Sequence, residues 1–260
     1  MMRGTTIAAL IVAAIAVLPG SSNAQDFEWQ GRVDRGDGVE IKGINGDIDA
    51  TYTSGSEVRV RAEKKGRDDD PSEVRIEVVE HGDGVTICAV YPDDGGRKNE
   101  CKPGDAGHLS SRDNDVSVHF VVEVPAGVEF RANTVNGGVD AAGLQSDIRA
   151  STVNGGINLS TSGLAKANTV NGSIKASMGR ADWTGDLDFN TVNGSITVEM
   201  PANAGARVKA STVNGGLETD FPLTIQGKFS NRKMEGTIGG GGRDLSLETV
   251  NGSIRLKKSG

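Results

Sequence analysis

Apolar and polar residues alternate in short runs along most of the chain, and this pattern predicts strands rather than helices. Short strands are predicted at residues 39–41, 58–60, 74–78 and 85–87, and a longer one at 116–125. Further along, alternating apolar pairs such as Ile157 and Leu159, or Ile196 and Val198, recur at regular intervals. The 37 Gly residues disfavour a large helical domain, because Gly is costly in helix interiors. The expected class is therefore all-β.

The tetrapeptide Thr-Val-Asn-Gly occurs six times in the second half of the chain. Its asparagines are Asn136, Asn154, Asn171, Asn193, Asn214 and Asn251, with spacings of 18, 17, 22, 21 and 37. The segment Met234-Glu235-Gly236-Thr237-Ile238 fits as a degenerate copy inside the longest spacing. An early outlier, Ile44-Asn45-Gly46-Asp47-Ile48, precedes the series. Asn-Gly tolerates positive φ at both positions, so each copy predicts a sharp turn.

Two architectures use such turns: an antiparallel meander with Asn-Gly hairpins and a β-solenoid with one coil per repeat. In a meander, equivalent turns do not touch, so nothing requires Thr-Val before each one. In a solenoid, equivalent residues stack about 4.8 Å apart, and the Asn amides can form a hydrogen-bonded ladder. The identical flanks therefore favour the solenoid, although they leave open whether the repeated Thr faces inward or outward.

The expected fold is a single-domain β-solenoid with short coils of about 16–22 residues. Residues 25–115 are expected to form N-terminal strands with acidic loops, continuous with the repeat solenoid of residues 116–260. Small residues before the repeats suit a narrow interior, which agrees with an aromatic content of only 4%.

Residues 1–24 have the features of a secretory signal peptide. Arg3 precedes an apolar stretch, and Ser22-Asn23-Ala24 places small residues at the cleavage site, so the mature chain is expected to begin at Gln25. The alternative is a retained membrane anchor, but the apolar run is too short to span comfortably. We expect an exported protein, periplasmic or secreted, with no transmembrane segment after signal cleavage.

Export also bears on the two cysteines, Cys88 and Cys101. An even number in an exported chain favours a disulfide over two unpaired thiols. Charge is uneven: residues 25–115 carry 22 acidic and 13 basic side chains, whereas residues 116–260 carry 13 and 14. The overall acidity argues against nucleic acid as a partner.

Several features together resemble one known family. They are the Ile44 to Ile48 segment, a strand ending in Val124-Pro125-Ala126-Gly127, the Thr-Val-Asn-Gly copies and Met200-Pro201. They resemble the bacterial "putative adhesin" β-strand-repeat family of unknown function, over nearly all of the mature chain. The resemblance implies a β-helical fold and an exported envelope protein with a structural or adhesin-like binding role. It implies no catalytic residues.

Candidate chemistry is sparse, and we expect neither an enzyme nor a bound cofactor or metal. The histidines His81, His108 and His119 form no His-x-x-x-His pair. An acidic run ending in Asp70, and a glycine run at 239–242, are expected to be solvated loops. The main alternative is a polysaccharide lyase or hydrolase on a β-helix, which would need clustered carboxylates on one face. Trp183 is expected to cover the core edge, with stacking on a sugar as the alternative.

One surface feature suggests a ligand. The basic residues Arg131, Arg149, Lys166 and Lys209 occupy the same place, three residues before the Thr-Val-Asn-Gly Thr, and Asp188 interrupts them. In stacked coils this basic row would place like charges about 5 Å apart, at a cost of roughly 1 kcal/mol in water. An anionic envelope glycan or lipid headgroup would offset the repulsion, whereas a solvated strip would need no ligand.

Overall fold

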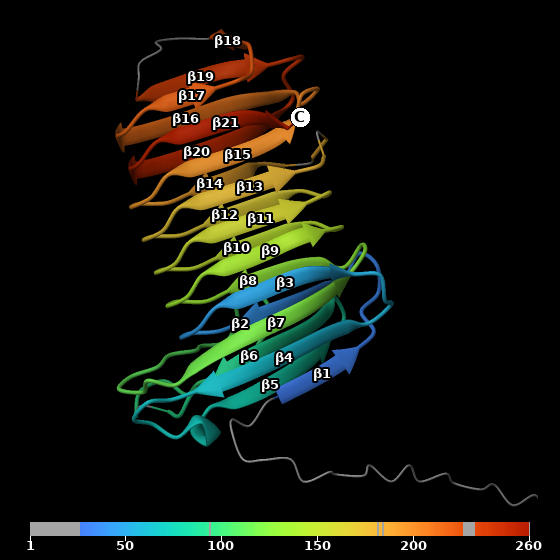
Figure 1. Cartoon of the computed structure of the whole chain (residues 1–260), viewed down its shortest axis with the longest axis vertical. Helices are drawn as coiled ribbons and strands as arrows, with labels where there is room; N and C mark the ends of the chain where they lie inside the picture. Colours follow the sequence, from blue (N-terminus) through green and yellow to red (C-terminus); the bar gives the residue numbers. More distant parts are fainter. Residues whose placement is uncertain (1–26, 94, 181, 184, 226–231, 260) are drawn as a thin grey trace, which may run out of the picture.

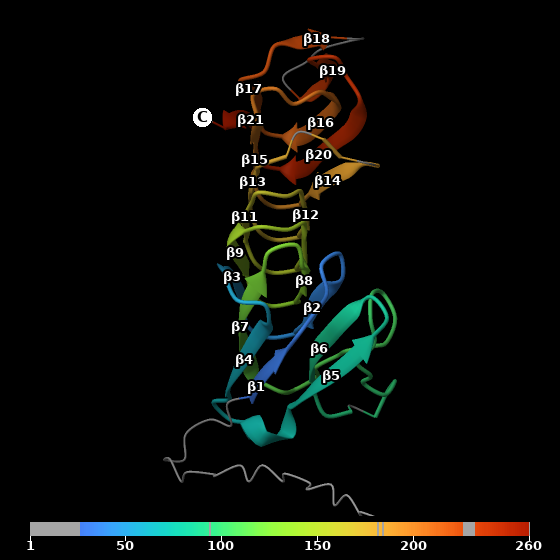
Figure 2. The same ribbon diagram turned by 90° about the vertical axis from the view of Figure 1, so that its right-hand side faces the viewer.

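The computed structural model describes residues 27–93, 95–180, 182–183, 185–225 and 232–259. Two β-sheets face each other along a rod, and the chain winds from one sheet to the other (Figure 1; Figure 2). The prediction of a β-solenoid is confirmed. The expected signal peptide lies outside the described residues. Within them, no helix is long and apolar enough to cross a membrane.

Ten strands form the first sheet. In spatial order they are β1 (Phe27–Gly31), β4 (Val58–Lys65), β7 (Ser117–Pro125), β3 (Ile48–Thr53), β9 (Val139–Leu144), β11 (Ile157–Thr161), β13 (Ile174–Met178), β15 (Ile196–Pro201), β21 (Ile254–Ser259) and β17 (Leu217–Thr219).

Eleven strands form the second sheet. Their order is β18 (Leu223–Ile225), β19 (Lys233–Ile238), β16 (Ala206–Asn214), β20 (Arg243–Asn251), β14 (Leu187–Asn190), β12 (Ala165–Asn168), β10 (Ile148–Ser151), β8 (Glu129–Asn133), β2 (Gly38–Lys42), β6 (Gly84–Val90) and β5 (Arg75–His81). A short 3-10 helix, η1 (Pro71–Glu73), lies between β4 and β5.

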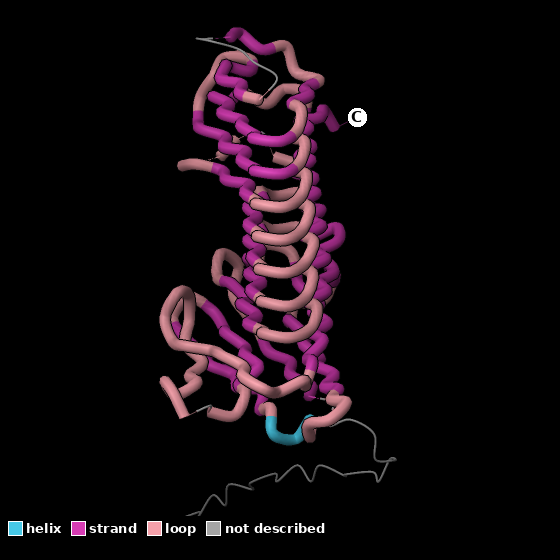
Figure 3. The backbone as a smooth tube through the Cα atoms, turned by 90° about the vertical axis from the view of Figure 1, so that its left-hand side faces the viewer, coloured by secondary structure: helices cyan, strands magenta, loops and turns pink. Residues whose placement is uncertain are grey.

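Each Thr-Val-Asn-Gly copy forms the corner at which the chain passes from the second sheet to the first, and these corners stack along the rod (Figure 3). Strands on either side alternate buried and exposed residues, so every second side chain enters the space between the sheets. Equivalent interior residues stack in register, for example Ile157 on Ile174 and Ile174 on Ile196. One continuous apolar core results.

The coils do not stack in sequence order at either end of the rod. The last coil, β20–β21, lies between the coil β14–β15 and the coil β16–β17. Asn251 therefore separates Asn193 from Asn214. At the other end, β2–β3 lies between β6–β7 and β8–β9, which makes the outlying Asn45 a full neighbour of Asn136.

The degenerate copy at residues 234–238 is not a coil. These residues belong to β19, which pairs antiparallel with β16 and with β18. Antiparallel pairs also occur at the opposite end, where β4 pairs with β7 and β1, and β5 with β6. The parallel stack is thus flanked at both ends by antiparallel strands.

The interleaved order can be tested with engineered disulfides. Ser253 and Ser195 are neighbours, because the Ser253 amide donates to the Ser195 hydroxyl oxygen at 3.2 Å. S195C with S253C should therefore cross-link on oxidation, as read by a mass loss of two hydrogens. The matched pair S195C with G216C should not, because the intervening coil separates these positions by about 10 Å, beyond the reach of a disulfide. Sequential stacking would give the opposite result.

Candidate binding surfaces

The repeated corner has a different chemistry at each of its positions. The Thr side chains are buried, with 3–6% of their surface exposed, so the repeated Thr faces inward. Each Thr hydroxyl donates to the carbonyl of a repeat Gly in the neighbouring coil, as Thr152 does to Gly137 at 2.8 Å. The next residue faces outward: Val153, Val170, Val192, Val213 and Val250 are 38–54% exposed.

The Asn side chains form a continuous ladder of amide hydrogen bonds on the surface. In each of the six Thr-Val-Asn-Gly copies the Asn Nδ2 donates to the Oδ1 of the Asn in an adjacent coil at 2.7–2.9 Å. In spatial order the ladder contains Asn45, Asn136, Asn154, Asn171, Asn193, Asn251 and Asn214. Because the side-chain amides are hydrogen-bonded to one another, the ladder holds the coils together and is not a ligand site.

The glycine of the corner has a different role from the expected one. Asp113 is the one non-glycine residue with a positive φ among the described residues. Of the glycines that follow the ladder asparagines, only Gly46 has a positive φ. The expectation of positive φ at both Asn and Gly was therefore wrong. Close packing explains the glycine instead: a Cβ on Gly155 would lie 1.9 Å from the carbonyl oxygen of Gly137 in the next coil.

Breaking the ladder at its centre should destabilise the protein. Asn171 donates to Asn154 and accepts from Asn193, both at 2.8 Å. Asn171→Ala removes both bonds and should lower the free energy of unfolding by about 1–3 kcal/mol in urea titrations. Asn171→Asp keeps the size but replaces the donor with a carboxylate oxygen that faces the Asn154 Oδ1, so a loss of stability is also expected. No loss for Asn171→Ala would show that the ladder does not stabilise the fold.

The basic row lies on the outward face of the second sheet, but its members are not all neighbours. Arg149 pairs in register with Arg131 on one side and Lys166 on the other. Asp188 and Ser246 then separate Lys166 from Lys209. Lys209 lies 3.3 Å from Glu248, whereas Lys166 has no ion pair with any described residue.

Glu129 neutralises part of this row. Its two carboxylate oxygens each lie 2.7 Å from a guanidinium, one of Arg131 and one of Arg149. Partial burial pushes the pKa of Glu129 upward, but the hydrogen bonds and charges of the two arginines outweigh it and hold the pKa below its usual value. Glu129 therefore stays ionised at neutral pH and offsets the repulsion that the sequence predicts for neighbouring cations.

Comparison with protein families identifies this architecture. The family model described as Toastrack DUF4097 matches residues 34–257. This chain belongs to the Toastrack DUF4097 family. The resemblance seen in the sequence is thereby confirmed.

Two solved structures that are similar to this chain are named as adhesion proteins. A putative cell adhesion protein from Clostridium sporogenes is 11% identical, covers 90% of this chain and 100% of its own, and has a TM-score of 0.41. A putative adhesin from Bacteroides fragilis is 12% identical, covers 89% and 97%, and has a TM-score of 0.34. Comparison with curated proteins gives no match.

Other candidate residues of this Toastrack chain have structural partners. His81 contacts the Thr86 hydroxyl at 3.1 Å, and His119 lies 3.2 Å from Asp49. Asp70 caps η1, and hydrogen bonds from the backbone amide and the side chain of Ser72 lower its pKa. His108 forms an isolated bridge with Glu100. The described residues contain no group of three or more His, Cys, Asp or Glu side chains suited to a metal.

Trp183 and the glycine run also have structural explanations. Only 3% of Trp183 is exposed, and it belongs to the apolar core, so it covers the core edge and is not available for stacking on a sugar. Gly239, Gly241 and Gly242 have positive φ and turn the chain between β19 and β20.

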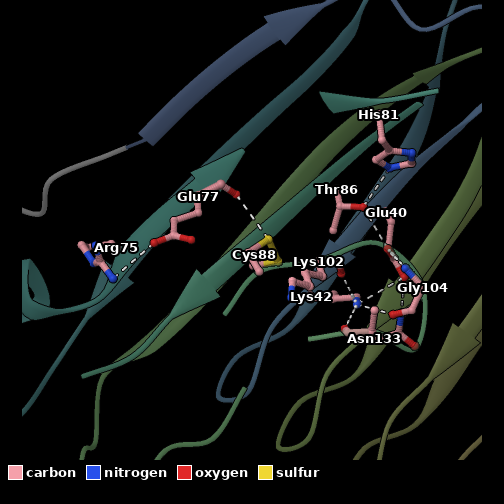
Figure 4. Close-up of a disulfide and its surroundings, with 12 residues drawn as sticks. Glu40, Lys42, Arg75, Glu77, His81, Thr86, Cys88, Lys102, Gly104 and Asn133 are labelled. Atoms are coloured by element: carbon pink, nitrogen blue, oxygen red, sulfur yellow. Dashed lines mark hydrogen bonds and ion pairs between the residues drawn. A yellow bond between two sulfur atoms is a disulfide. The ribbon is translucent and has the colours of Figure 1, made fainter. Parts of the chain in front are cut away.

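A disulfide joins Cys88 in β6 to Cys101 in the long loop that follows, with 5.7 Å between the Cα atoms (Figure 4). Beside it, the Lys42 ammonium donates to the backbone carbonyls of Lys102, at 2.6 Å, and Gly104. The buried Glu40 carboxylate accepts from the Gly104 amide at 2.9 Å. The disulfide and these two side chains clasp the loop against the outward face of the second sheet.

Sequence reasoning missed this clasp and the part played by Glu129. Glu129 and Arg131 share one strand and one face, since side chains alternate along a strand. Their separation of two residues was the available signal. Glu40 and Lys42 have the same spacing on β2.

Proposed function

We propose that this Toastrack chain is an exported, non-enzymatic protein of the bacterial envelope with an adhesin-like binding role, and that its basic row holds an anionic envelope glycan. Export is supported by the signal-peptide pattern of residues 1–24. The role in binding is supported by the adhesion names of the similar structures.

One observation supports an anionic glycan as the ligand. Arg131, Arg149 and Lys166 lie on three adjacent parallel strands with their side chains on the outer face. Although Glu129 bridges the two arginines, neither Nη atom of Arg149 has a hydrogen-bond partner among the described residues. Adjacent coils thus offer cationic donors at about 4.8 Å, a spacing suited to a linear anionic polymer that runs along the rod.

Binding at such an exposed row should be weak per contact and sensitive to salt. We expect the quadruple variant R131Q, R149Q, K166Q and K209Q to bind sedimented envelope fractions at least about tenfold more weakly than the mature wild-type protein. The affinity of the wild type should also fall as salt rises from low to physiological concentration.

The matched control is R207Q, which removes an outward arginine paired with Asp244 near the far end of the same sheet. It should bind envelope fractions like the wild type. If circular dichroism shows both proteins to be folded and the quadruple variant binds as strongly as the wild type, the row is only a solvated surface. Binding to extracted lipid vesicles, with none to the glycan fraction, would reject the glycan as the ligand.

A further inference from the structure

A polar cavity of about 340 Å³ lies next to the basic row, where the chain passes from the first sheet to the second. Successive turns of the solenoid line it, with Gln145, Ser146 and Asp147 from one turn and Ser162 and Gly163 from the next. Glu129 and Arg149, from the adjacent strands β8 and β10, form the side nearest the row. The cavity thus shares Arg149 with the row.

Two segments that do not repeat also line the cavity. Gly36 belongs to the turn before β2, and Arg180 to the turn between β13 and β14, which is longer than those after β9 and β11. Arg180 adds a second guanidinium to the lining.

The side chains around the cavity offer both donors and acceptors. Arg149 uses its Nε on Glu129, while Arg180 uses Nε and Nη2 on Asp182 and keeps Nη1 3.9 Å from Asp147. Free guanidinium N–H groups therefore remain on both arginines, within the described chain. Asp147 accepts a hydrogen bond at Oδ1 from the Leu164 amide, and its Oδ2 has no hydrogen-bond donor among the described residues.

A buried hydroxyl lies in the wall of the cavity. Ser146 lines the cavity and is 8% exposed, yet its Oγ has no hydrogen-bond partner in the described chain. Buried polar groups are rarely left unpaired, because an unpaired group loses its bonds to water without replacement. The Oγ is itself covered from solvent, so it lies unpaired within the wall of the cavity.

We propose that this cavity binds one acidic sugar unit of the glycan held by the row, an inference that rests on the proposed function. The sugar carboxylate hydrogen-bonds to the free N–H groups of Arg149 and Arg180, as guanidinium forks favour. Ring hydroxyls donate to Asp147 and exchange hydrogen bonds with the Gln145 amide. The mixture of cations and carboxylates selects against a polyphosphate, whose charge the carboxylates would repel.

The test is a titration of the mature protein with glucuronate, followed by the backbone amide shifts of the cavity residues in NMR spectra. Glucuronate should shift the amides of residues 145–147 and 162–163 in a saturable manner, and glucose should do so at least about tenfold more weakly. R180Q should weaken glucuronate binding about tenfold, because Arg180 lies in the cavity but outside the row. R207Q should leave it unchanged.

Three results would overturn the inference: no saturable shift with glucuronate, equal binding of glucose, or unchanged binding by a folded R180Q variant. Envelope binding separates this failure from that of the proposed function. If the wild type binds envelope glycan through the row while glucuronate leaves the cavity amides unmoved, only the cavity assignment fails. If the wild type binds neither, both fail.

Discussion

Gly155→Ala should lower the free energy of unfolding by about 3 kcal/mol or more. The added Cβ would lie 1.9 Å from the Gly137 carbonyl oxygen and 2.5 Å from its carbonyl carbon. These are backbone atoms of the neighbouring coil, so relief requires the corners to separate and the ladder bonds beside them to lengthen. Urea unfolding followed by circular dichroism measures the loss.

The matched control is the next residue. A Cβ on Gly156 would meet its nearest neighbour, the Ser173 carbonyl oxygen, at an ordinary 3.6 Å. Other copies carry Ser at this position, as at Ser173 and Ser195. Gly156→Ala should therefore change stability by less than about 0.5 kcal/mol. Equal effects of the two substitutions would contradict the close stacking of the corners.

Removing the disulfide should cost the protein about 3 kcal/mol. The bond closes a loop of about 14 residues, and in the chain-entropy model its loss frees that loop in the unfolded state. C88S with C101S leaves the rest of the clasp in place, so the variant should fold but unfold at lower urea concentration. Lys42→Met in the same background tests the clasp separately.

The expected order of stability is wild type, then the double serine variant, then the triple variant. A loss below about 0.5 kcal/mol for the double variant would show that Lys42 and Glu40 hold the loop without the disulfide.

The sequence predicted the solenoid because identical flanks are needed only where equivalent residues touch. It could not predict the order of the coils, for the same reason. Asn214 and Asn251 carry the same amide group, so the ladder chemistry would be equal whichever of their coils lay next to Asn193. The order depends instead on connections, and antiparallel β19 fills the interval that a degenerate repeat seemed to occupy.

The orientation of the corner was also hidden in the sequence. Thr and Val have nearly the same shape, and either could face the interior. The buried Thr is preferred inward because its hydroxyl satisfies a Gly carbonyl that the corner leaves inside, as Thr169 does for Gly155 at 3.0 Å. Val in its place would leave that carbonyl with one fewer donor.

The candidate site was predictable only in its repeated part. Equal offsets from each repeat identified Arg131, Arg149, Lys166 and Lys209. Two acidic neighbours offset this charge. Glu129 lies two residues from Arg131 on the same strand, and Glu248 lies beside Lys209 because of the interleaved order of the coils. Arg180 belongs to a turn of irregular length, and nothing in its sequence position links it to Arg149.

The measurement that tests the account most directly is capture of envelope glycan by the mature protein. Immobilised wild type is incubated with an envelope extract, and the bound and unbound glycans are sized and identified by mass spectrometry. The account predicts recovery of an intact acidic glycan by the wild type and by R207Q, with little recovery by the quadruple variant. Recovery of shortened glycan without added cofactor, or equal recovery by the quadruple variant, would contradict a non-enzymatic binding protein that acts through its basic row.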